Sequence, residues 1–189
     1  MKRLTVLPAL TLLAGFLAAT PALSQDLGGT LKKIKDSGGA TMGVRESSGG
    51  LSFTIGDGKF AGFHVELCQR ALADVQKQLG LAKLDIKYQP VTSQNRIPLM
   101  QNGTIDIECG STTNNAARQK DVSFAATTYV EEVRIAVRAN SGITSIAQLN
   151  GKNVATTTGT TSVQLLRKHE RGTGVNLSLI HISEPTRPY

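Results

Sequence analysis

Two loops of the sequence gather arginine and hydroxyl side chains of the kind that bind a carboxylate. They are residues 92–96, which include Ser93 and Arg96, and residues 110–118, which include Ser111, Thr113 and Arg118. Arginine pairs with both oxygens of a carboxylate, and hydroxyls and free backbone N–H groups add further polar contacts. A free amino acid carries a carboxylate and an ammonium group, so these loops contain much of what an amino-acid site requires.

A third polar loop, residues 157–162, contains Thr157 and Thr160 and leads into a predicted helix. The N-terminus of a helix attracts carboxylates through its exposed N–H groups and the helix dipole. A phosphate-binding loop would need a lysine and a spacing that this loop lacks. The simplest alternative is that its threonines only cap the helix.

Taken one at a time, the polar residues of the first two loops can each be explained by an ordinary structural role. Ser93 and Ser111 could cap helices or turns, and Arg96 and Arg118 could be solvated surface charges. Because the residues cluster in two short loops, a shared binding role is the interpretation we favour.

Patterns typical of enzymes and metal sites are missing from the sequence. His64 and His169 lie far apart and have no cysteine, histidine or aspartate partner at metal-ligand spacing. Glu46 and Asp57 stand in polar loops, where solvation is the simpler role, and no G-x-S-x-G nucleophile motif occurs. We therefore expect no catalytic residue, no metal and no cofactor.

The composition also argues against a nucleic-acid partner. The formal net charge is +7, but the basic residues are scattered and aromatic residues make up only 4%. Nucleic-acid sites combine clustered Lys and Arg with aromatic side chains that stack on bases. A modest positive charge suits an acidic small ligand instead.

Alternating strand and helix patterns position the polar loops. The elements that we expect are helices at 27–36, 64–79 and 96–101, strands at 40–44, 84–89, 105–108 and 130–137, and a hairpin within 51–63. This order predicts an α/β fold with a largely parallel sheet. Each of the first two polar loops directly follows a strand, where ligands of open α/β sheets bind.

A second strand–loop–helix unit begins after a change of composition near residue 139. Residues 153–156 read as a strand and residues 162–169 as a helix, with the threonine loop between them. We therefore divide the chain into a first lobe at 25–138 and the start of an incomplete second lobe at 139–176.

The N-terminus predicts export. Lys2 and Arg3 precede an apolar run at 4–19, and Ala22 and Ser24 fit a cleavage site, so residues 1–24 read as a cleavable signal peptide. A membrane anchor would need about 20 uninterrupted apolar residues. A periplasmic location follows as our expectation.

The two cysteines, Cys68 and Cys109, are expected to form a disulfide because disulfides persist in oxidising compartments. The alternative is that they are two separate buried thiols.

The C-terminal residues 177–189 stand apart from the rest. The string LSLIHISEPTR resembles the translated read of a sequencing adapter. We therefore expect an artefactual tail after a gene cut at about Asn176, and disfavour the alternative of an ordinary C-terminal strand.

Three stretches carry a resemblance to a known family. They are GVRESSGGLSF at 43–53, TSQNRIPLMQNGTIDIECGSTTNNAARQK at 92–120, and TTTGTTS at 156–162. They resemble the periplasmic glutamate/aspartate-binding proteins of ATP-driven (ABC) uptake systems, in family 3 of the solute-binding proteins. The resemblance implies a type II periplasmic-binding-protein fold, in which two lobes close over one amino acid. The first lobe would be nearly complete and the second truncated.

The resemblance also implies roles for eight residues. Arg45, Arg96 and Arg118 would face ligand carboxylates, Ser93, Ser111 and Thr113 would add contacts from the first lobe, and Thr157 and Thr160 would add contacts from the second. The implied partners are L-glutamate or L-aspartate and the permease subunits of an ABC transporter at the inner membrane. The family's ammonium-binding acidic residue and its return crossover would lie beyond residue 176.

Three alternatives remain open at this point. The ligand could be another polar amino acid, the scaffold could serve an enzyme like cyclohexadienyl dehydratase, or the module could be part of a sensor. One methylene separates glutamate from aspartate, and these residues do not distinguish them.

Overall fold

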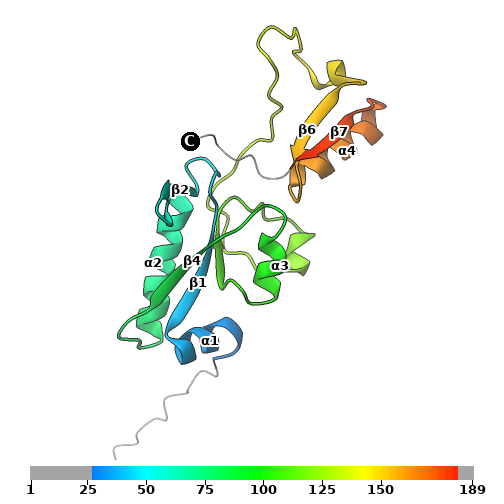
Figure 1. The fold of residues 1–189 in the computed structure, drawn as a ribbon. Coiled ribbons are helices and arrows are strands. Elements are labelled where there is room, and N and C mark those ends of the chain that lie inside the picture. The colour runs from blue at the N-terminus through cyan, green and yellow to red at the C-terminus, as the bar shows by residue number, and fades with distance from the viewer. Residues whose placement is uncertain (1–26, 183–189) are drawn as a thin grey trace, which may run out of the picture.

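The computed structural model describes residues 27–182. The predicted signal peptide at 1–24 and residues 183–189 of the adapter-like tail lie outside the described residues. Within them the chain forms two units joined by a long extended segment (Figure 1). The first unit runs from helix α1 (Gly29–Ser37) to the 3-10 helix η1 (Arg118–Lys120), and the second begins at the 3-10 helix η2 (Ile146–Leu149).

The first unit is built on a three-stranded parallel sheet. Its strands are β1 (Gly39–Val44), β4 (Asp85–Pro90) and β5 (Ile107–Cys109), in the order β4-β1-β5. The register places Val44 opposite both Pro90 and Cys109. All three strands therefore end at one level, and their following loops leave from one edge of the sheet.

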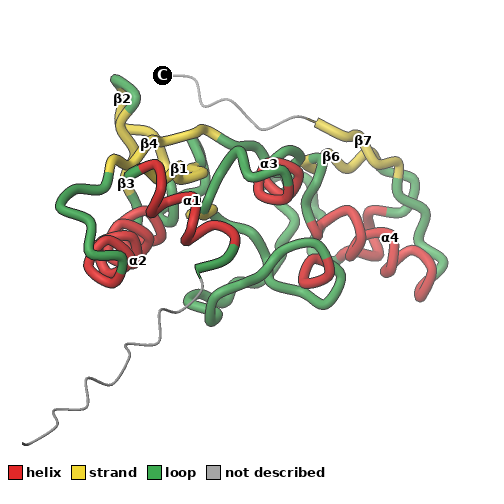
Figure 2. The backbone as a smooth tube through the Cα atoms, turned by 90° about the horizontal axis from the view of Figure 1, so that it is seen from below, coloured by secondary structure: helices red, strands yellow, loops and turns green. Residues whose placement is uncertain are grey.

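Helices cover this sheet. Figure 1 places α2 (Phe63–Gln78) and α3 (Arg96–Gln101) on opposite sides of β1, and Figure 2 shows α1 and α2 on the same side of the chain's first unit. The core contains Ile34 of α1, Val65 and Leu72 of α2, and Met42 of β1. In α2 the two buried residues lie seven positions apart and therefore share one face of the helix, whereas Phe63 and Leu67 are 51% and 39% exposed.

A short hairpin connects β1 to α2. It consists of β2 (Phe53–Gly56) and β3 (Lys59–Ala61), and its turn places Asp57 and Gly58 at positive φ. The turn lies where the Gly-Asp-Gly sequence predicts it.

The predicted disulfide is present. Cys68 in α2 is bonded to Cys109 at the end of β5, with a Cα–Cα distance of 6.2 Å. The bond fastens α2 to the strand from which the second polar loop leaves.

The second unit has a sheet and a core of its own. Strand β6 (Asn153–Thr157) pairs in parallel with β7 (Ser178–Ile182), and α4 (Thr161–Thr173) connects them. The core residues are Leu149, Val154, Leu166 and Leu177. The lobe boundary at residue 138 stays a prediction.

The adapter-like segment contains a strand, which is the alternative that the sequence analysis disfavoured. Residues 178–182 pair with β6 along its length, and Leu177 before them is buried. Its N–H donates to Oε1 of Glu170 over 2.7 Å. An alternating apolar segment can fill an open sheet edge whatever its origin, so the origin of this tail stays a prediction.

The predicted strand at 130–137 is wrong. These residues are extended but form no strand, and Val130 remains 87% exposed. Alternation predicts which face of a strand would be buried, but a strand forms only where a neighbouring edge supplies hydrogen bonds. Within residues 27–182, residues 130–137 pair with no strand.

Across residues 27–182, none of the helices combines the length and apolar composition that crossing a bilayer requires.

We predict that replacing both Cys68 and Cys109 with alanine lowers the free energy of unfolding by about 2–4 kcal/mol. The reason is that the bond closes a segment with a sequence separation of 41 and so restricts the unfolded chain. Urea unfolding followed by circular dichroism measures the change. Reductant should lower the stability of the parent chain equally and leave the variant unaffected; an unchanged parent midpoint after reduction would contradict the prediction.

Candidate functional site

A cavity of about 310 Å³ lies where the loops after the first-unit strands face the threonine loop of the second unit. We call it the Arg45 cavity. Its lining residues are Arg45, Ser47, Ser48, Gly49, Leu51, Ser93, Ser111, Glu131, Thr157 and Thr160. Five of the eight residues that the family resemblance singled out, Arg45, Ser93, Ser111, Thr157 and Thr160, are thus brought together. That they contact a ligand stays a prediction.

Arg45 connects the loops at the edge of the sheet. Its Nη1 donates to the carbonyl oxygen of Val91 over 3.2 Å, and its Nε donates to Oγ of Ser48 over 3.1 Å. The Ser48 hydroxyl also lies 3.0 Å from the hydroxyl of Ser111. Arg45, a residue that is only 4% exposed, therefore links the loops after β1 and β4 directly and the loop after β5 through the Ser48 hydroxyl.

Gly110 permits this close packing. A Cβ atom at this position would lie 2.4 Å from Cγ of Arg45 and 2.5 Å from Oε1 of Glu108. Only glycine lets the loop after β5 approach the arginine side chain this closely.

The loop after β4 is organised by residues other than Ser93. Thr92 N–H donates to Oδ1 of Asn95 over 2.8 Å, and Asn95 N–H donates to Oγ1 of Thr92 over 3.2 Å. Ser93 is buried and lines the cavity. Its role is thus not that of the helix cap, because Asn95 occupies the N-cap position of α3.

Two of the eight predicted residues, Arg96 and Thr113, line neither the Arg45 cavity nor a second, neighbouring cavity that Arg118 lines. Arg96 is 3% exposed at the start of α3, so it is not the solvated surface charge that we considered. Thr113 is exposed, and its carbonyl oxygen accepts a hydrogen bond from Nη1 of Arg118 over 3.1 Å.

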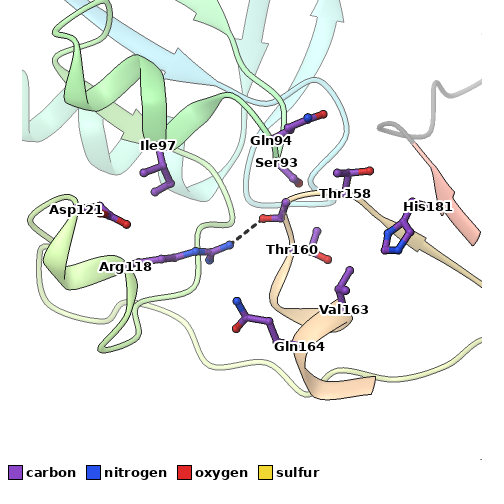
Figure 3. A pocket seen from close by; sticks show the side chains of 11 residues that line it. Ser93, Gln94, Ile97, Arg118, Asp121, Thr158, Thr160, Val163, Gln164 and His181 are labelled. Carbon is purple, nitrogen blue, oxygen red and sulfur yellow. Dashed lines mark hydrogen bonds between the residues drawn. The ribbon is translucent and has the colours of Figure 1, made fainter. Parts of the chain in front are cut away.

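Arg118 lines a neighbouring cavity of about 450 Å³, which we call the Arg118 cavity. Figure 3 shows its side chain reaching from the first unit toward the loop before α4. Its Nη2 donates to the carbonyl oxygen of Gly159 over 3.0 Å. Ser93 and Thr160 line both cavities, so the two spaces adjoin.

Burial of the guanidinium lowers the pKa of Arg118 below its usual value, and the negative charge of Glu108 acts in the opposite direction. Arginine remains protonated at any working pH despite such a shift. Arg118 therefore supplies a positive charge beside the Arg45 cavity.

Gly159 of the second unit lies close against the loop after β4 of the first unit. Its φ is +77°, and a Cβ atom there would lie 2.5 Å from the carbonyl oxygen of Ser93 and 2.7 Å from Cα of Gln94. The threonine loop can therefore rest on the loop after β4 only while this residue has no side chain.

The threonine loop is also stabilised from within. Thr160 is the N-cap residue of α4, and its hydroxyl donates to the carbonyl oxygen of Thr157 over 2.8 Å. The start of α4 thus faces the cavity with the positive end of its dipole.

Sequence reasoning missed three polar lining residues. Ser47 and Ser48 follow Arg45 in a loop that leaves the same sheet edge as the other two, and this position was a usable signal. Glu131 lies in the segment that was predicted as a strand, and nothing local marked it.

The arrangement suits a small zwitterion. Arg45 is the cation and Glu131 the carboxylate that line the Arg45 cavity, and the remaining polar side chains are hydroxyls. Within residues 27–182, no group of three or more metal-ligating side chains occurs.

The sequence pattern of the bacterial extracellular solute-binding proteins, family 3, matches residues 40–179. The chain belongs to this family.

Similar sequences occur in bacteria. An L-glutamate/L-aspartate-binding protein of Pseudomonas aeruginosa is 41% identical over 171 residues, which cover 90% of this chain and 57% of the relative. A glutamate/aspartate import solute-binding protein of Escherichia coli is 40% identical over 179 residues, which cover 95% of this chain and 59% of the relative. The family 3 chain described here thus spans less than two thirds of these relatives.

A solved structure supports the fold. An ancestral amino acid-binding protein, a precursor of cyclohexadienyl dehydratase, matches with a TM-score of 0.66 at 27% identity, covering 82% of this chain and 65% of that chain. The predicted α/β fold of the type II periplasmic-binding-protein kind is confirmed.

We predict that Gly159→Ala separates the two units, because the added methyl would meet the Ser93 backbone. Gly174→Ala is the matched control, since Gly174 has a similar φ of +71° with open space around it. Small-angle X-ray scattering should show a larger maximum dimension for Gly159→Ala alone. Equal scattering from the two variants would contradict the prediction.

Proposed function

We propose that this chain is the amino-acid-binding part of a periplasmic solute-binding protein that delivers glutamate or aspartate to an ABC transporter. The proposal is supported by the names of the relatives at 40–43% identity, which are glutamate/aspartate-binding or import proteins. The resemblance stated from the sequence leads to the same ligands.

The Arg45 cavity is the observation that carries the proposal. Arg45 would bind one carboxylate of the ligand, and Glu131 would bind its ammonium group. The hydroxyls of Ser93, Ser111 and Thr160 would complete the polar shell. A volume of about 310 Å³ is near the lower end of the range for small-ligand pockets, as a single amino acid requires.

The preference for an acidic ligand would come from Arg118. Its guanidinium lies in the adjoining cavity, and Ser93 and Thr160 lie between the two spaces. A side-chain carboxylate that extends past these residues would reach the second arginine. The hydrogen bond from Arg118 to Gly159 joins the two units. The Arg118 guanidinium would therefore serve both in binding the ligand and in holding the two units together.

We propose binding without turnover. The Arg45 cavity holds a guanidinium and hydroxyls that bind a carboxylate, and no base with a hydrogen-bonded nucleophile is found among its described lining residues. The enzyme alternative retains one supporting observation, since Glu131 is a carboxylate in the cavity. Incubation with glutamate followed by mass spectrometry tests this point, because any product would contradict a pure binding role.

The location and the partner complete the proposal. Residues 1–24 would direct export, with permease subunits at the inner membrane as the receiving partner.

Arg45→Ala should weaken glutamate binding at least about 30-fold, because truncating one partner of a buried charge pair typically costs 2 kcal/mol or more. Calorimetric titration of the chain without residues 1–24 measures the affinity. Arg138→Ala, an exposed arginine outside both cavities, should bind as the parent does.

The same titration tests the ligand class. Glutamate and aspartate should bind more tightly than glutamine, and Arg118→Ala should reduce that difference. No binding of any amino acid, or a preference for neutral ones, would contradict the proposal.

Glu131→Gln should weaken glutamate binding roughly 10-fold, because a neutral amide replaces the carboxylate that accepts from the ammonium group. Glutarate lacks that ammonium group, so its affinity should not fall. Glu132→Gln is the matched control, since Glu132 pairs with Arg134 outside the cavity. Equal losses for glutamate and glutarate would show that Glu131 has another role.

A further inference from the structure

We propose that His64 is a positioning residue that holds together three of the segments that line the Arg45 cavity. This inference rests on the proposed function only for the choice of ligand in its test. The segments are the loop after β1, the loop after β5 and the extended segment that leads to the second unit. His64 makes one hydrogen-bond contact to each of them.

The first contact is made by the backbone. The N–H of His64 donates to the carbonyl oxygen of Leu51 over 3.0 Å, and Leu51 lines the cavity. Gly62 permits this approach, because a Cβ atom there would lie 2.5 Å from the same carbonyl oxygen at a φ of +130°. The start of α2 is thereby set against the first loop.

The second contact defines the protonation of the ring. Nδ1 of His64 lies 2.5 Å from the carbonyl oxygen of Gly110. A carbonyl oxygen can only accept, so Nδ1 must carry the proton. The next residue along the chain is Ser111, whose hydroxyl lies at the cavity. His64 thus fixes the backbone from which this hydroxyl projects.

The third contact reaches the extended segment. Nε2 of His64 lies 2.9 Å from Oγ1 of Thr128, and Glu131 lies three residues further on. With the proton on Nδ1, a neutral ring accepts at Nε2 from the Thr128 hydroxyl. Residues 130–137 form no strand, so a side-chain contact here anchors a segment that no sheet holds in place.

The geometry separates this role from general support of the fold. Cys68 already bonds α2 to β5 one helical turn further along, so the first unit retains its anchor without the imidazole. What His64 adds is the relative placement of Leu51, Ser111 and Glu131, three lining residues from three separate segments.

The test uses four variants of the full chain. His64→Asn keeps a donor near the position of Nδ1 and loses the Thr128 contact, and Thr128→Val loses the same contact from the other side. His64→Ala loses both side-chain contacts. His169→Ala, in α4 of the second unit, is the control histidine.

Hydrogen–deuterium exchange without ligand is the first readout. We expect His64→Ala to speed amide exchange about 5- to 10-fold, as loss of one hydrogen bond predicts, both around Ser111 and at 128–131. His64→Asn and Thr128→Val should speed exchange only at 128–131, and His169→Ala at neither place. In the parent chain, the ¹⁵N spectrum of the ring should show the proton on Nδ1.

Each outcome bears on the inference. Unchanged exchange in His64→Ala, or a ring proton on Nε2 alone, overturns it. If His64→Ala unfolds, His64→Asn and Thr128→Val still decide, because their predicted effect is confined to one segment.

Glutamate titration is the second readout and separates the two proposals. His64→Ala should bind about 10-fold more weakly than the parent, with partial recovery in His64→Asn. If the variants show the expected changes in exchange but the parent binds no glutamate, the proposed function is refuted and the positioning role is supported. If every variant with altered exchange still binds glutamate as tightly as the parent does, His64 does not position the residues that line the Arg45 cavity.

Discussion

The binding edge of this protein depends on the register of three parallel strands. Val44 lies opposite both Pro90 and Cys109, so three loops leave the sheet at one level. A shift of one residue would turn alternate side chains to the other face. It would also move the Val91 carbonyl away from Arg45, which now contacts it over 3.2 Å. The arrangement of polar groups is thus a consequence of backbone pairing.

Helix α2 fixes that edge from one side. Residues four apart on a helix lie on the same face, and His64 and Cys68 use this spacing to contact consecutive residues, Gly110 and Cys109. One contact is a hydrogen bond and the other is covalent. The loop after β5 therefore leaves its strand with little freedom in direction, and the small Gly110 is compatible with the crowding that results.

Local patterns predicted most of the fold but less of the site. The elements from α1 to β5 carry their own periodicity and stop signals, so they were predictable to within about two residues. The conformation of residues 130–137 was not predictable in this way. Whether they form a strand depends on a neighbouring strand edge from a distant part of the sequence, which local alternation cannot reveal. The same limit explains why Glu131 was missed, and why Arg96 and Thr113 were expected at a cavity that they do not line. Ser47 and Ser48 were predictable from their place after β1.

The central strand of the sheet is also the first strand of the chain. During synthesis from the N-terminus, β1 emerges with both edges unpaired and finds its neighbours only when β4 and later β5 have been made. The complete sheet and the disulfide must therefore wait until Cys109 has emerged. Until then the nascent chain exposes an apolar strand that other polypeptides can pair with. The order of the strands thus sets an interval in which the growing chain needs protection from aggregation.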